Sequence, residues 1–450
     1  MRTERNKVYM LPLGCAKNLV NAEQMLALLK AAGMEICESP DGCDAAIVNT
    51  CGFIDSAKSE AIDAILRLGE LKKQGRLRAI VAAGCMTERY RGEVLSELPE
   101  VDAVLGTGSY GDIVSAVLAA LEGGNKEYFA PKERCMIMGE RVLLTPAYSA
   151  YLRVAEGCDN HCAYCVIPSI RGPYRSAPLE ALEQEARRLA EQGAKELLVI
   201  AQDVSRYGTD LYGKRALTDL LERLERIEQL RWIRLHYLYP DELDNELIDY
   251  VARSRKVLHY FDLPIQHISD RILKTMNRRG DGALIRGRID AIRGKIPDAV
   301  IRTSLISGFP GETEKEHTEL CEFLEAYQLQ RAGVFAYSRE EGSPAAEMPK
   351  QIPEKIKQRR VSELYAIQQQ VMETFSRGMV GQTLEVLCCG RDEDGRLYGR
   401  SYMDSPDIDG LVYLEDTDAA EGDFLSIEIT AAEGCDLFGR PAQNREASEL

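Results

Sequence analysis

The chain has 450 residues, 45% of them hydrophobic and 28% charged, which excludes a disordered polypeptide and leaves room for about two to four folded domains. No apolar run approaches the roughly 18–20 residues that span a bilayer, and the first residues, MRTERNKVYMLPLGC, hold no secretory signal, so we expect a cytoplasmic protein with no membrane partner. The net charge of −16 argues against nucleic acid as the default partner, because nucleic-acid binding depends on Lys and Arg, and it favours a basic partner.

Residues 1–142 are predicted to form a parallel α/β domain. Short apolar segments at 8–13, 45–50 and 79–84 have the composition of buried strands, and the segment 18–32 carries apolar residues at helical spacing. Strands that alternate with helices are typical of a parallel sheet, because each helix returns the chain to the same edge.

Residues 143–377 continue this alternation and are predicted to form a partial barrel of βα units followed by a connector helix. Helices at 178–192 and 217–227 separate strand candidates, and 353–377 reads as one long polar-rich helix with an apolar stripe. Six such units suggest a barrel whose functional site lies at the C-terminal ends of its strands. The strand candidates are AYLRVAEG, KELLVIAQD, RWIRLHYL, YFDLPIQ, AVIRTSLISG and RAGVFAYS.

Residues 378–443 have a different character. TLEVLCCG, LYGRS, GLVYL and FLSIEIT are short strand candidates broken by Gly, Asp and Pro. This pattern is typical of a small antiparallel β-barrel of about the size of an OB fold. The sequence therefore predicts an α/β protein of three domains, with boundaries near residues 142 and 377.

The strongest chemical signal is the segment EGCDNHCAYC, in which Cys158, Cys162 and Cys165 follow a predicted strand. In a reducing compartment, clustered cysteines point to metal or redox chemistry rather than to disulfides. Thiolates suit an iron–sulfur cluster or zinc, and unrelated structural cysteines are the remaining alternative. Three thiolates leave one iron of a four-iron cluster open, whereas zinc would need a fourth ligand, for which His161 is the candidate.

This cysteine spacing resembles that of the radical S-adenosylmethionine superfamily. The resemblance implies that the three cysteines hold a [4Fe-4S] cluster, which binds S-adenosylmethionine at its open iron and cleaves it reductively. It also implies contacts with that cofactor from Tyr164 near the adenine, from Gln202 and Asp203 near the methionyl amine, and from the backbone of Gly308 and Pro310 beside the adenosine. By itself, the segment SGFPGE that contains the last two residues is equally compatible with a plain turn.

A second set of cysteines is dispersed along the first domain. Cys15 in PLGCAKN, Cys51 in VNTCGFID and Cys85 in AAGCMTERY each follow a predicted strand and lie at or before a helix start. The ends of parallel strands share one edge, so the three thiols can converge there, although three unrelated buried cysteines are the alternative from spacing alone. The three segments resemble the N-terminal domain of the methylthiotransferases, which implies a second [4Fe-4S] cluster with an open iron on these residues.

The remaining cysteines lack such contexts, and we expect them to pack in the interior or lie at the surface. Cys388 and Cys389 are neighbours in a predicted strand, where adjacent side chains face opposite sides, so we do not expect them to bind one metal together. The others are Cys37, Cys43, Cys135, Cys321 and Cys435.

The resemblance to the methylthiotransferases extends over residues 7–442 and includes the order of the three domains: a methylthiotransferase domain at 1–142, a radical S-adenosylmethionine barrel at 143–377 and a TRAM domain at 378–443. Members of this family insert a methylthio group at an unactivated C–H bond. MLPLGCAKNLVNAE, CDNHCAYCVIPSIRGPYRS and FAYSREEGSPA resemble the RimO branch, which modifies the β-carbon of an aspartate in protein twelve of the small ribosomal subunit. The alternative is the branch that modifies adenosine beside the tRNA anticodon.

The charge of the C-terminal domain favours a protein substrate independently of any resemblance. Residues 378–450 contain 17 acidic and 5 basic residues, a net charge of −12. A tRNA-binding barrel should carry a basic groove with stacking aromatics, whereas an acidic barrel repels phosphate and attracts a Lys/Arg-rich ribosomal protein. We therefore expect protein twelve to bind through the TRAM domain and do not expect tRNA binding; an acidic module with no partner is the alternative.

The resemblance implies a reaction that consumes two molecules of S-adenosylmethionine per product. One would give its methyl group to a sulfur on the auxiliary cluster, and the other would be cleaved at the first cluster to produce the radical that removes the aspartyl β-hydrogen. An electron donor such as flavodoxin or ferredoxin is implied as well. A non-catalytic iron–sulfur electron carrier and a ribosome-associated binding protein are the alternatives from other functional classes.

Four polar residues outside these motifs are weaker candidates. Arg171 and Arg175 follow the cysteine loop and could pair with a carboxylate or a cluster sulfur, although a surface position is commoner for arginine. Gln266 and His267 end a predicted barrel strand, where a role in the site and a packed polar pair are equally expected.

Overall fold

The computed structural model describes residues 6–133 and 136–442, and the chain divides into two compact units. The first unit contains residues 1–192, 197–227 and 338–347, and the second contains 193–196, 228–337 and 348–450. Cys135 and residue 443, the expected end of the last domain, lie outside the described residues. Among the helices of the described ranges, none has the length and apolar character needed to cross a membrane.

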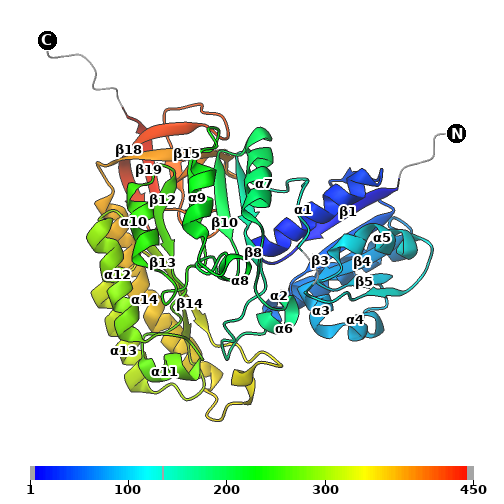
Figure 1. The fold of residues 1–450 in the computed structure, drawn as a ribbon, viewed down its shortest axis with the longest axis horizontal. Helices are drawn as coiled ribbons and strands as arrows, with labels where there is room; N and C mark the ends of the chain where they lie inside the picture. Colours follow the sequence, from blue (N-terminus) through cyan, green and yellow to red (C-terminus); the bar gives the residue numbers. More distant parts are fainter. Residues whose placement is uncertain (1–5, 134–135, 443–450) are drawn as a thin grey trace. The chain divides into compact units, whose positions relative to one another are not determined.

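The first unit contains a parallel sheet of six strands in the order β2-β1-β3-β4-β5-β6, as the alternating pattern predicts (Figure 1). The strands are β1 (Lys7–Pro12), β2 (Glu35–Cys37), β3 (Ala45–Thr50), β4 (Ala79–Gly84), β5 (Ala103–Leu105) and β6 (Lys126–Tyr128). Every residue of β3 and β4 is buried, which a parallel sheet covered on both faces requires.

Helices cover both faces of this sheet (Figure 1). They are α1 (Ala16–Ala31), α2 (Asp55–Lys73), α3 (Cys85–Tyr90), α4 (Gly92–Glu97) and α5 (Ile113–Leu121), with a short 3-10 turn at Tyr110–Asp112. On one face, Met25 of α1 and Val117 of α5 pack with Ile47 of β3. On the other face, Ile65 of α2 packs with Val48, the next residue of the same strand, because adjacent strand residues point to opposite sides.

The rest of the first unit carries the CxxxCxxC loop. Its elements are β7 (Ser149–Arg153), β8 (Ala155–Glu156), α6 (Ile167–Arg171), β9 (Arg175–Ser176), α7 (Leu179–Glu191), β10 (Glu196–Ile200), α8 (Thr209–Tyr212), α9 (Leu217–Glu225) and a 3-10 turn at Pro344–Glu347. The first residue of β10 belongs to the second unit. Helix α6 directly follows the loop, and its Ile170 packs with Val166, Phe53 and Cys85. This contact brings the loop against the helix that Cys85 begins.

The second unit begins with four parallel strands in the order β14-β13-β12-β11, each followed by helical segments. The strands are β11 (Trp232–Leu235), β12 (Val257–Asp262), β13 (Val300–Ser307) and β14 (Arg331–Ala336), and the helices are α10 (Asn245–Arg253), α11 (Asp270–Thr275), α12 (Gly282–Lys295), α13 (Glu314–Tyr327) and α14 (Glu354–Gly378). The predicted connector helix is α14. It is anchored to the chain before β14 because Gln368 donates a hydrogen bond to the Leu329 carbonyl, 3.0 Å away.

A small closed β-barrel completes the second unit. Its strands, in barrel order, are β15 (Thr383–Arg391), β16 (Leu397–Ser401), β17 (Val412–Leu414), β19 (Asp436–Pro441) and β18 (Phe424–Glu433). The predicted antiparallel pairing is right for four pairs and wrong for β17 and β19, which are parallel. The reason is that β19, which the sequence pattern does not reveal, runs antiparallel to β18 and closes the barrel by pairing with β17. Because β17 and β19 run in the same direction, this last pair is parallel.

Candidate functional site: two cysteine constellations in one unit

The CxxxCxxC loop lies between β8 and α6 and presents its thiols to backbone donors. The Asn160 N–H lies 3.5 Å from the Cys158 sulfur, and the Ile167 N–H lies 3.4 Å from the Cys165 sulfur. Cys158 and Cys162 are buried, and Cys165 is half-buried. Burial raises the pKa of Cys158 to about 11, because the apolar surroundings oppose the charged thiolate.

Gly157 allows the two ends of this loop to meet. Its φ is +80°, and a Cβ atom at this position would stand 2.0 Å from the Pro173 carbonyl oxygen and 2.6 Å from that of Gly172. The Cys158 N–H donates to the same Gly172 oxygen at 3.1 Å. A side chain at position 157 would therefore force apart the chain segments that enter and leave the loop.

Gln202 and Asp203, both predicted to face a cofactor amine, have different surroundings. The Asp203 carboxylate accepts hydrogen bonds from Asn160 of the cysteine loop at 3.0 Å and from Ser205 at 2.5 Å. Gln202 donates to Glu156 at 3.3 Å, and its buried Oε1 accepts no hydrogen bond from the described residues. Asp203 thus positions the loop, whereas Gln202 keeps an acceptor for a bound donor.

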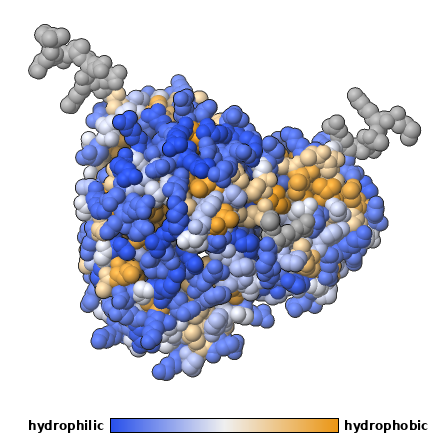
Figure 2. All heavy atoms as spheres, in the orientation of Figure 1, coloured by the Kyte–Doolittle hydropathy of each residue, from blue (hydrophilic) through white to orange (hydrophobic). Residues whose placement is uncertain are grey.

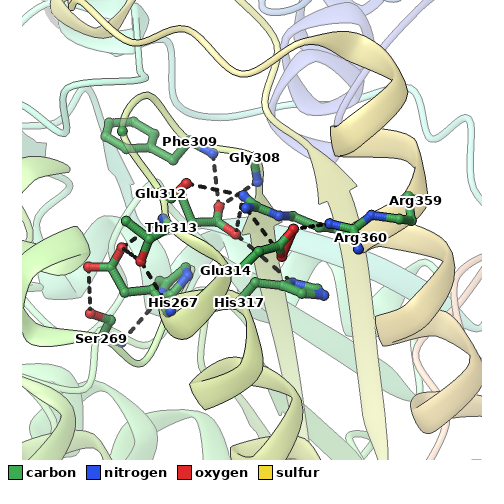
Figure 3. Close-up of polar contacts among 12 residues, drawn as sticks. His267, Ser269, Gly308, Phe309, Glu312, Thr313, Glu314, His317, Arg359 and Arg360 are labelled. Carbon is green, nitrogen blue, oxygen red and sulfur yellow. Dashed lines mark hydrogen bonds and ion pairs between the residues drawn. The ribbon is translucent and has the colours of Figure 1, made fainter.

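Tyr164 and the end of β13 are the other predicted cofactor contacts. Tyr164 is half-buried in the cysteine loop. Gly308 and Pro310 follow β13 in the second unit, where Glu312 holds the backbone (Figure 3). Its carboxylate accepts the Gly308 N–H at 2.5 Å and the Phe309 N–H at 3.1 Å.

A buried ion pair completes this turn. Burial raises the pKa of Glu312 to about 7, against the opposing effects of Arg360 and of the two N–H groups. Arg360 of α14 donates to the other oxygen of Glu312 at 3.1 Å (Figure 3). The side chain of Lys357, from the same helix, packs on Gly308: a Cβ atom added to Gly308 would lie 2.4 Å from the Lys357 Cγ. The glycine is therefore required by α14; a contact of this turn with adenosine stays a prediction.

His267 is a packed residue in the structure. It is buried, and its Nδ1 lies 3.0 Å from the Ser269 N–H, which makes Nδ1 the acceptor and leaves the proton on Nε2. Burial lowers the pKa of His267 to about 3, so the ring is neutral at physiological pH. Gln266 beside it has a left-handed backbone, with φ of 71°.

The dispersed cysteines lie on three touching segments at one edge of the first sheet. Cys15 precedes the first residue of α1, Cys51 follows β3, and Cys85 is the first residue of α3. A Cβ atom on Gly14 would stand 2.9 Å from the Cys51 sulfur, and a Cβ atom on Gly52 would stand 3.1 Å from the Cys85 carbonyl carbon. The three segments are therefore in contact, and a shared cluster on their thiols stays a prediction.

The three thiols differ in their electrostatic surroundings. Cys15 is exposed to solvent. The atoms packed around its thiol disfavour the thiolate and so act to raise its pKa. The positive charges of Lys17 and Arg171 outweigh this effect, so the net result is a lowered pKa. Burial raises the pKa of Cys51 and raises that of Cys85 to about 12. Cys15 is thus the thiol best prepared to become a thiolate and the most accessible to an incoming cluster.

Asn18 holds the ends of two strands beside these cysteines. Its Nδ2 donates to the Leu13 and Thr50 carbonyl oxygens, each at 2.9 Å. Its backbone carbonyl oxygen accepts a hydrogen bond from the Asn49 side chain at 2.6 Å. Leu13 and Thr50 lie directly before the Gly14-Cys15 pair and Cys51, respectively. The spacing of the cysteines does not reveal this role, because an Asn early in a helix is usually read as a capping or surface residue.

Of the two alternatives for Arg171, the structure confirms the pair with a carboxylate and contradicts the surface position. Its side chain is buried because α6 packs against α3, and it pairs with Glu156 at 2.8 Å. Glu156 also pairs with Arg153 at 2.7 Å, and although burial raises the pKa of this carboxylate, the two arginine charges lower it to about 2. Arg175 is half-buried and donates to the Pro173 carbonyl oxygen at 2.7 Å.

The donor sets of both constellations suit an iron–sulfur cluster. Within residues 6–133 and 136–442, no three His, Cys, Asp or Glu side chains converge as ligands of a single metal ion. A four-iron cluster takes one thiolate per iron, so its ligands are spaced more widely than those of one ion. At each site, three cysteines are accompanied by groups that stabilise negative sulfur, namely backbone N–H donors at one and Arg171 at the other.

Comparison with protein families finds three matches along the chain. Residues 7–106 match the uncharacterized protein family UPF0004, residues 152–324 match the radical SAM superfamily, and residues 380–441 match the TRAM domain. Together these matches include both cysteine constellations and the closed barrel.

Curated relatives match nearly the whole chain. One is named ribosomal protein uS12 methylthiotransferase RimO, from Lachnoclostridium phytofermentans; it is 45% identical over 436 residues, which are 96% of this chain and 99% of that protein. A protein of the same name from Clostridioides difficile is 43% identical over 440 residues, covering 96% of this chain and 98% of its own.

Among solved structures, the fold is similar to the radical S-adenosylmethionine methyltransferase TsrM from Kitasatospora setae, whose structure holds cobalamin and a [4Fe-4S] cluster. The TM-score is 0.56 at 13% identity, over 76% of this chain and 74% of that one. At this identity, the similarity concerns the fold alone.

Proposed function

This chain belongs to the RimO family of radical S-adenosylmethionine methylthiotransferases, and on that premise we propose that it methylthiolates the β-carbon of an aspartate in ribosomal protein uS12. The observation that carries the proposal is that the helix following the CxxxCxxC loop packs against Cys85. Ile170, five residues after Cys165, packs with Cys85 in the same unit. A hydrogen abstraction and a sulfur transfer on one carbon require two reactive centres side by side, which this packing supports.

The proposal assigns ligands to both sites. Cys158, Cys162 and Cys165 would hold one [4Fe-4S] cluster, and Cys15, Cys51 and Cys85 would hold a second. When bound, the clusters and two molecules of S-adenosylmethionine supply the electron, the radical and the methyl and sulfur groups. An electron donor such as flavodoxin or ferredoxin serves the first cluster.

The remaining site residues bind S-adenosylmethionine or position the cysteine loop. Gln202 accepts a hydrogen bond from the methionyl ammonium through its Oε1, which no described residue occupies. Asp203 fixes the cysteine loop through Asn160. The resemblance assigns Tyr164 to the adenine and the backbone of Gly308 and Pro310 to the adenosine.

We assign residues 1–142 to the methylthiotransferase domain, residues 143–377 to the radical S-adenosylmethionine domain and residues 378–443 to the TRAM domain. The protein substrate binds to the closed β-barrel of the TRAM domain. On the face in Figure 2, hydrophilic side chains cover the region of β15 and β18. We define the acidic face as the exposed residues Glu393, Asp394, Asp416, Asp418 and Glu421. These residues lie on two loops, one between β15 and β16 and the other between β17 and β18. An ion pair between Arg391 and Asp418, 3.7 Å apart, joins the two loops.

Not every acidic residue of this barrel is available to a partner. Asp404 pairs with Arg331 at 2.8 Å, and Glu385 accepts from Trp232 at 2.9 Å. The Asp409 carboxylate accepts from Tyr260 at 2.6 Å. The acidic face nevertheless favours basic uS12 over tRNA, and the reaction belongs in the cytoplasm, where ribosomal proteins are made.

Mass spectrometry of uS12 tests the function. Incubation of the reconstituted enzyme with uS12 should add one methylthio group to an aspartate, and tRNA should remain unmodified. Cys158→Ala should abolish 5′-deoxyadenosine formation, whereas Cys15→Ala should keep cleavage and lose methylthiolation. A methylthiolated adenosine in tRNA, with unmodified uS12, would instead assign the enzyme to the tRNA branch.

A further inference from the structure

Arg171 connects the two cysteine constellations through one guanidinium group. It is the last residue of α6, which follows the CxxxCxxC loop, and its side chain is fully buried. Nη1 donates to Glu156 at 2.8 Å and to Asn21 at 3.3 Å. Nη2 donates to Asn18 at 2.8 Å and lies 3.4 Å from the sulfur of Cys85.

These partners come from both proposed cluster sites. Glu156 stands two residues before Cys158, Asn18 stands three residues after Cys15, and Cys85 is itself a proposed ligand. All of them belong to the first unit. Because a guanidinium group has a rigid planar fork, its contacts on one side fix the direction of the N–H groups on the other.

The contact with Cys85 has a chemical consequence that the other contacts lack. Hydrogen bonds and positive charge at a cluster sulfur stabilise the more negative, reduced cluster and therefore raise its reduction potential. Arginine keeps its charge at every physiological pH, and burial lets this charge act with little screening. Glu156, Asn18 and Asn21 anchor the guanidinium so that Nη2 stays directed at the sulfur.

We propose that Arg171 is a positioning residue for the auxiliary cluster: it donates a hydrogen bond to the Cys85 sulfur and raises the reduction potential of the cluster held by Cys15, Cys51 and Cys85. This inference rests on the proposed function, because that function places a cluster on these cysteines. It goes further in assigning control of that cluster to a residue of the other cysteine loop.

A purely structural role for Arg171 is distinguishable, because the chain contains a matched arginine. Arg153 is also buried, also pairs with Glu156, at 2.7 Å, and also donates to an amide oxygen, that of Gln24, at 3.0 Å. Its described hydrogen bonds and ion pairs include no cysteine. Replacement of Arg153 removes a buried ion pair of the same carboxylate without removing a donor to sulfur.

The experiment is a potentiometric titration of the auxiliary cluster, followed by electron paramagnetic resonance. The full chain carries Ala at Cys158, Cys162 and Cys165, so that only the auxiliary cluster is reconstituted. Arg171→Gln should lower the ratio of reduced to oxidised cluster about tenfold at the wild-type midpoint, which is a shift of about −59 mV for one electron. Arg153→Gln should leave the midpoint unchanged, and Arg171→Lys, which keeps the charge, should give an intermediate value.

An unchanged midpoint in Arg171→Gln, with full iron content, would overturn the proposal. If Arg171→Gln loses iron, Arg171→Lys decides: an intermediate midpoint supports the proposal, and a wild-type midpoint overturns it. Equal shifts in Arg171→Gln and Arg153→Gln would also overturn it, because both would then act only through Glu156. Failure of the parent protein to bind any iron is a different result, since it would contradict the proposed function and not the role of Arg171.

Discussion

Gly14 and Cys51 approach so closely that a Cβ atom on Gly14 would stand 2.6 Å from the Cβ and 2.9 Å from the sulfur of Cys51. Gly14 has φ of +85°, so a substitution there adds backbone strain to the steric overlap. Gly14→Ala should displace Cys51 or Cys15 and reduce reconstituted iron by roughly half, because one of two four-iron clusters is lost. Iron analysis and spectroscopy of the remaining cluster provide the measurement.

The control for Gly14 is Gly33, which has nearly the same φ of +86° but no atom within 4 Å of an added Cβ. Gly33→Ala should lose about 1 kcal/mol of stability through backbone strain and retain all of its iron. Full iron content in Gly14→Ala would show either that Cys51 is not a ligand or that its segment shifts without disturbing the cluster.

Gln202→Leu should weaken the binding of S-adenosylmethionine while the first cluster remains intact. Leucine has a similar volume but no acceptor, so a hydrogen bond from a charged ammonium is lost, which corresponds to about a tenfold rise in Kd. Equilibrium binding to the reconstituted enzyme measures the change, and Gln192→Leu at the exposed end of α7 is the control. Unaltered affinity in Gln202→Leu would remove this residue from the cofactor site.

Glu196→Gln should destabilise the second unit strongly. The buried Glu196 carboxylate pairs with Arg234 at 3.1 Å and with Arg400 of the closed barrel at 2.6 Å. Without it, two buried guanidinium groups lose their counter-ion, which costs about 3–5 kcal/mol of unfolding free energy. Denaturant unfolding measures the loss, and Glu222→Gln on the exposed face of α9 should leave stability unchanged.

The same carboxylate predicts a pH dependence. Burial raises the pKa of Glu196, but Arg400 and Arg234 outweigh this effect and hold it at about 2, below its ordinary value of 4.5. Its stabilising contribution is therefore complete above pH 4.5 and is lost as the pH falls towards 2. The stability difference between wild type and Glu196→Gln should be constant above about pH 5 and should shrink below it. A difference that stays constant down to pH 3 would contradict the ion pair.

Charge reversal on the acidic face should weaken binding of uS12. Asp416→Lys with Asp418→Lys changes the net charge of two exposed positions and removes attraction to a Lys/Arg-rich partner. The affinity should fall, and its dependence on salt should become less steep. The control is Glu93→Lys with Glu97→Lys, two exposed positions of α4. Equal losses in both pairs would indicate a nonspecific charge effect.

Secondary structure follows from the sequence where apolar runs are uninterrupted. The segments 45–50 and 79–84 coincide with β3 and β4, because strands covered on both faces consist largely of apolar residues. The strands β5 and β19 escape detection because β5 has only three residues and β19 mixes Asp, Gly and Arg with its apolar residues. Pairing with neighbours, and not their own pattern, makes them strands.

The chain alone is enough to single out six candidate cysteine ligands: short spacing marks Cys158, Cys162 and Cys165, and the resemblance to the methylthiotransferases marks Cys15, Cys51 and Cys85. Residue pattern together with this resemblance therefore predicts the order of the domains and the class of chemistry. Packing of the folded chain, and no local pattern, brings Arg171 to Cys85 and Glu196 to Arg400, pairs separated by 86 and 204 positions. Charged side chains become strong partners only when folding removes them from water, and burial is a property of the packed chain.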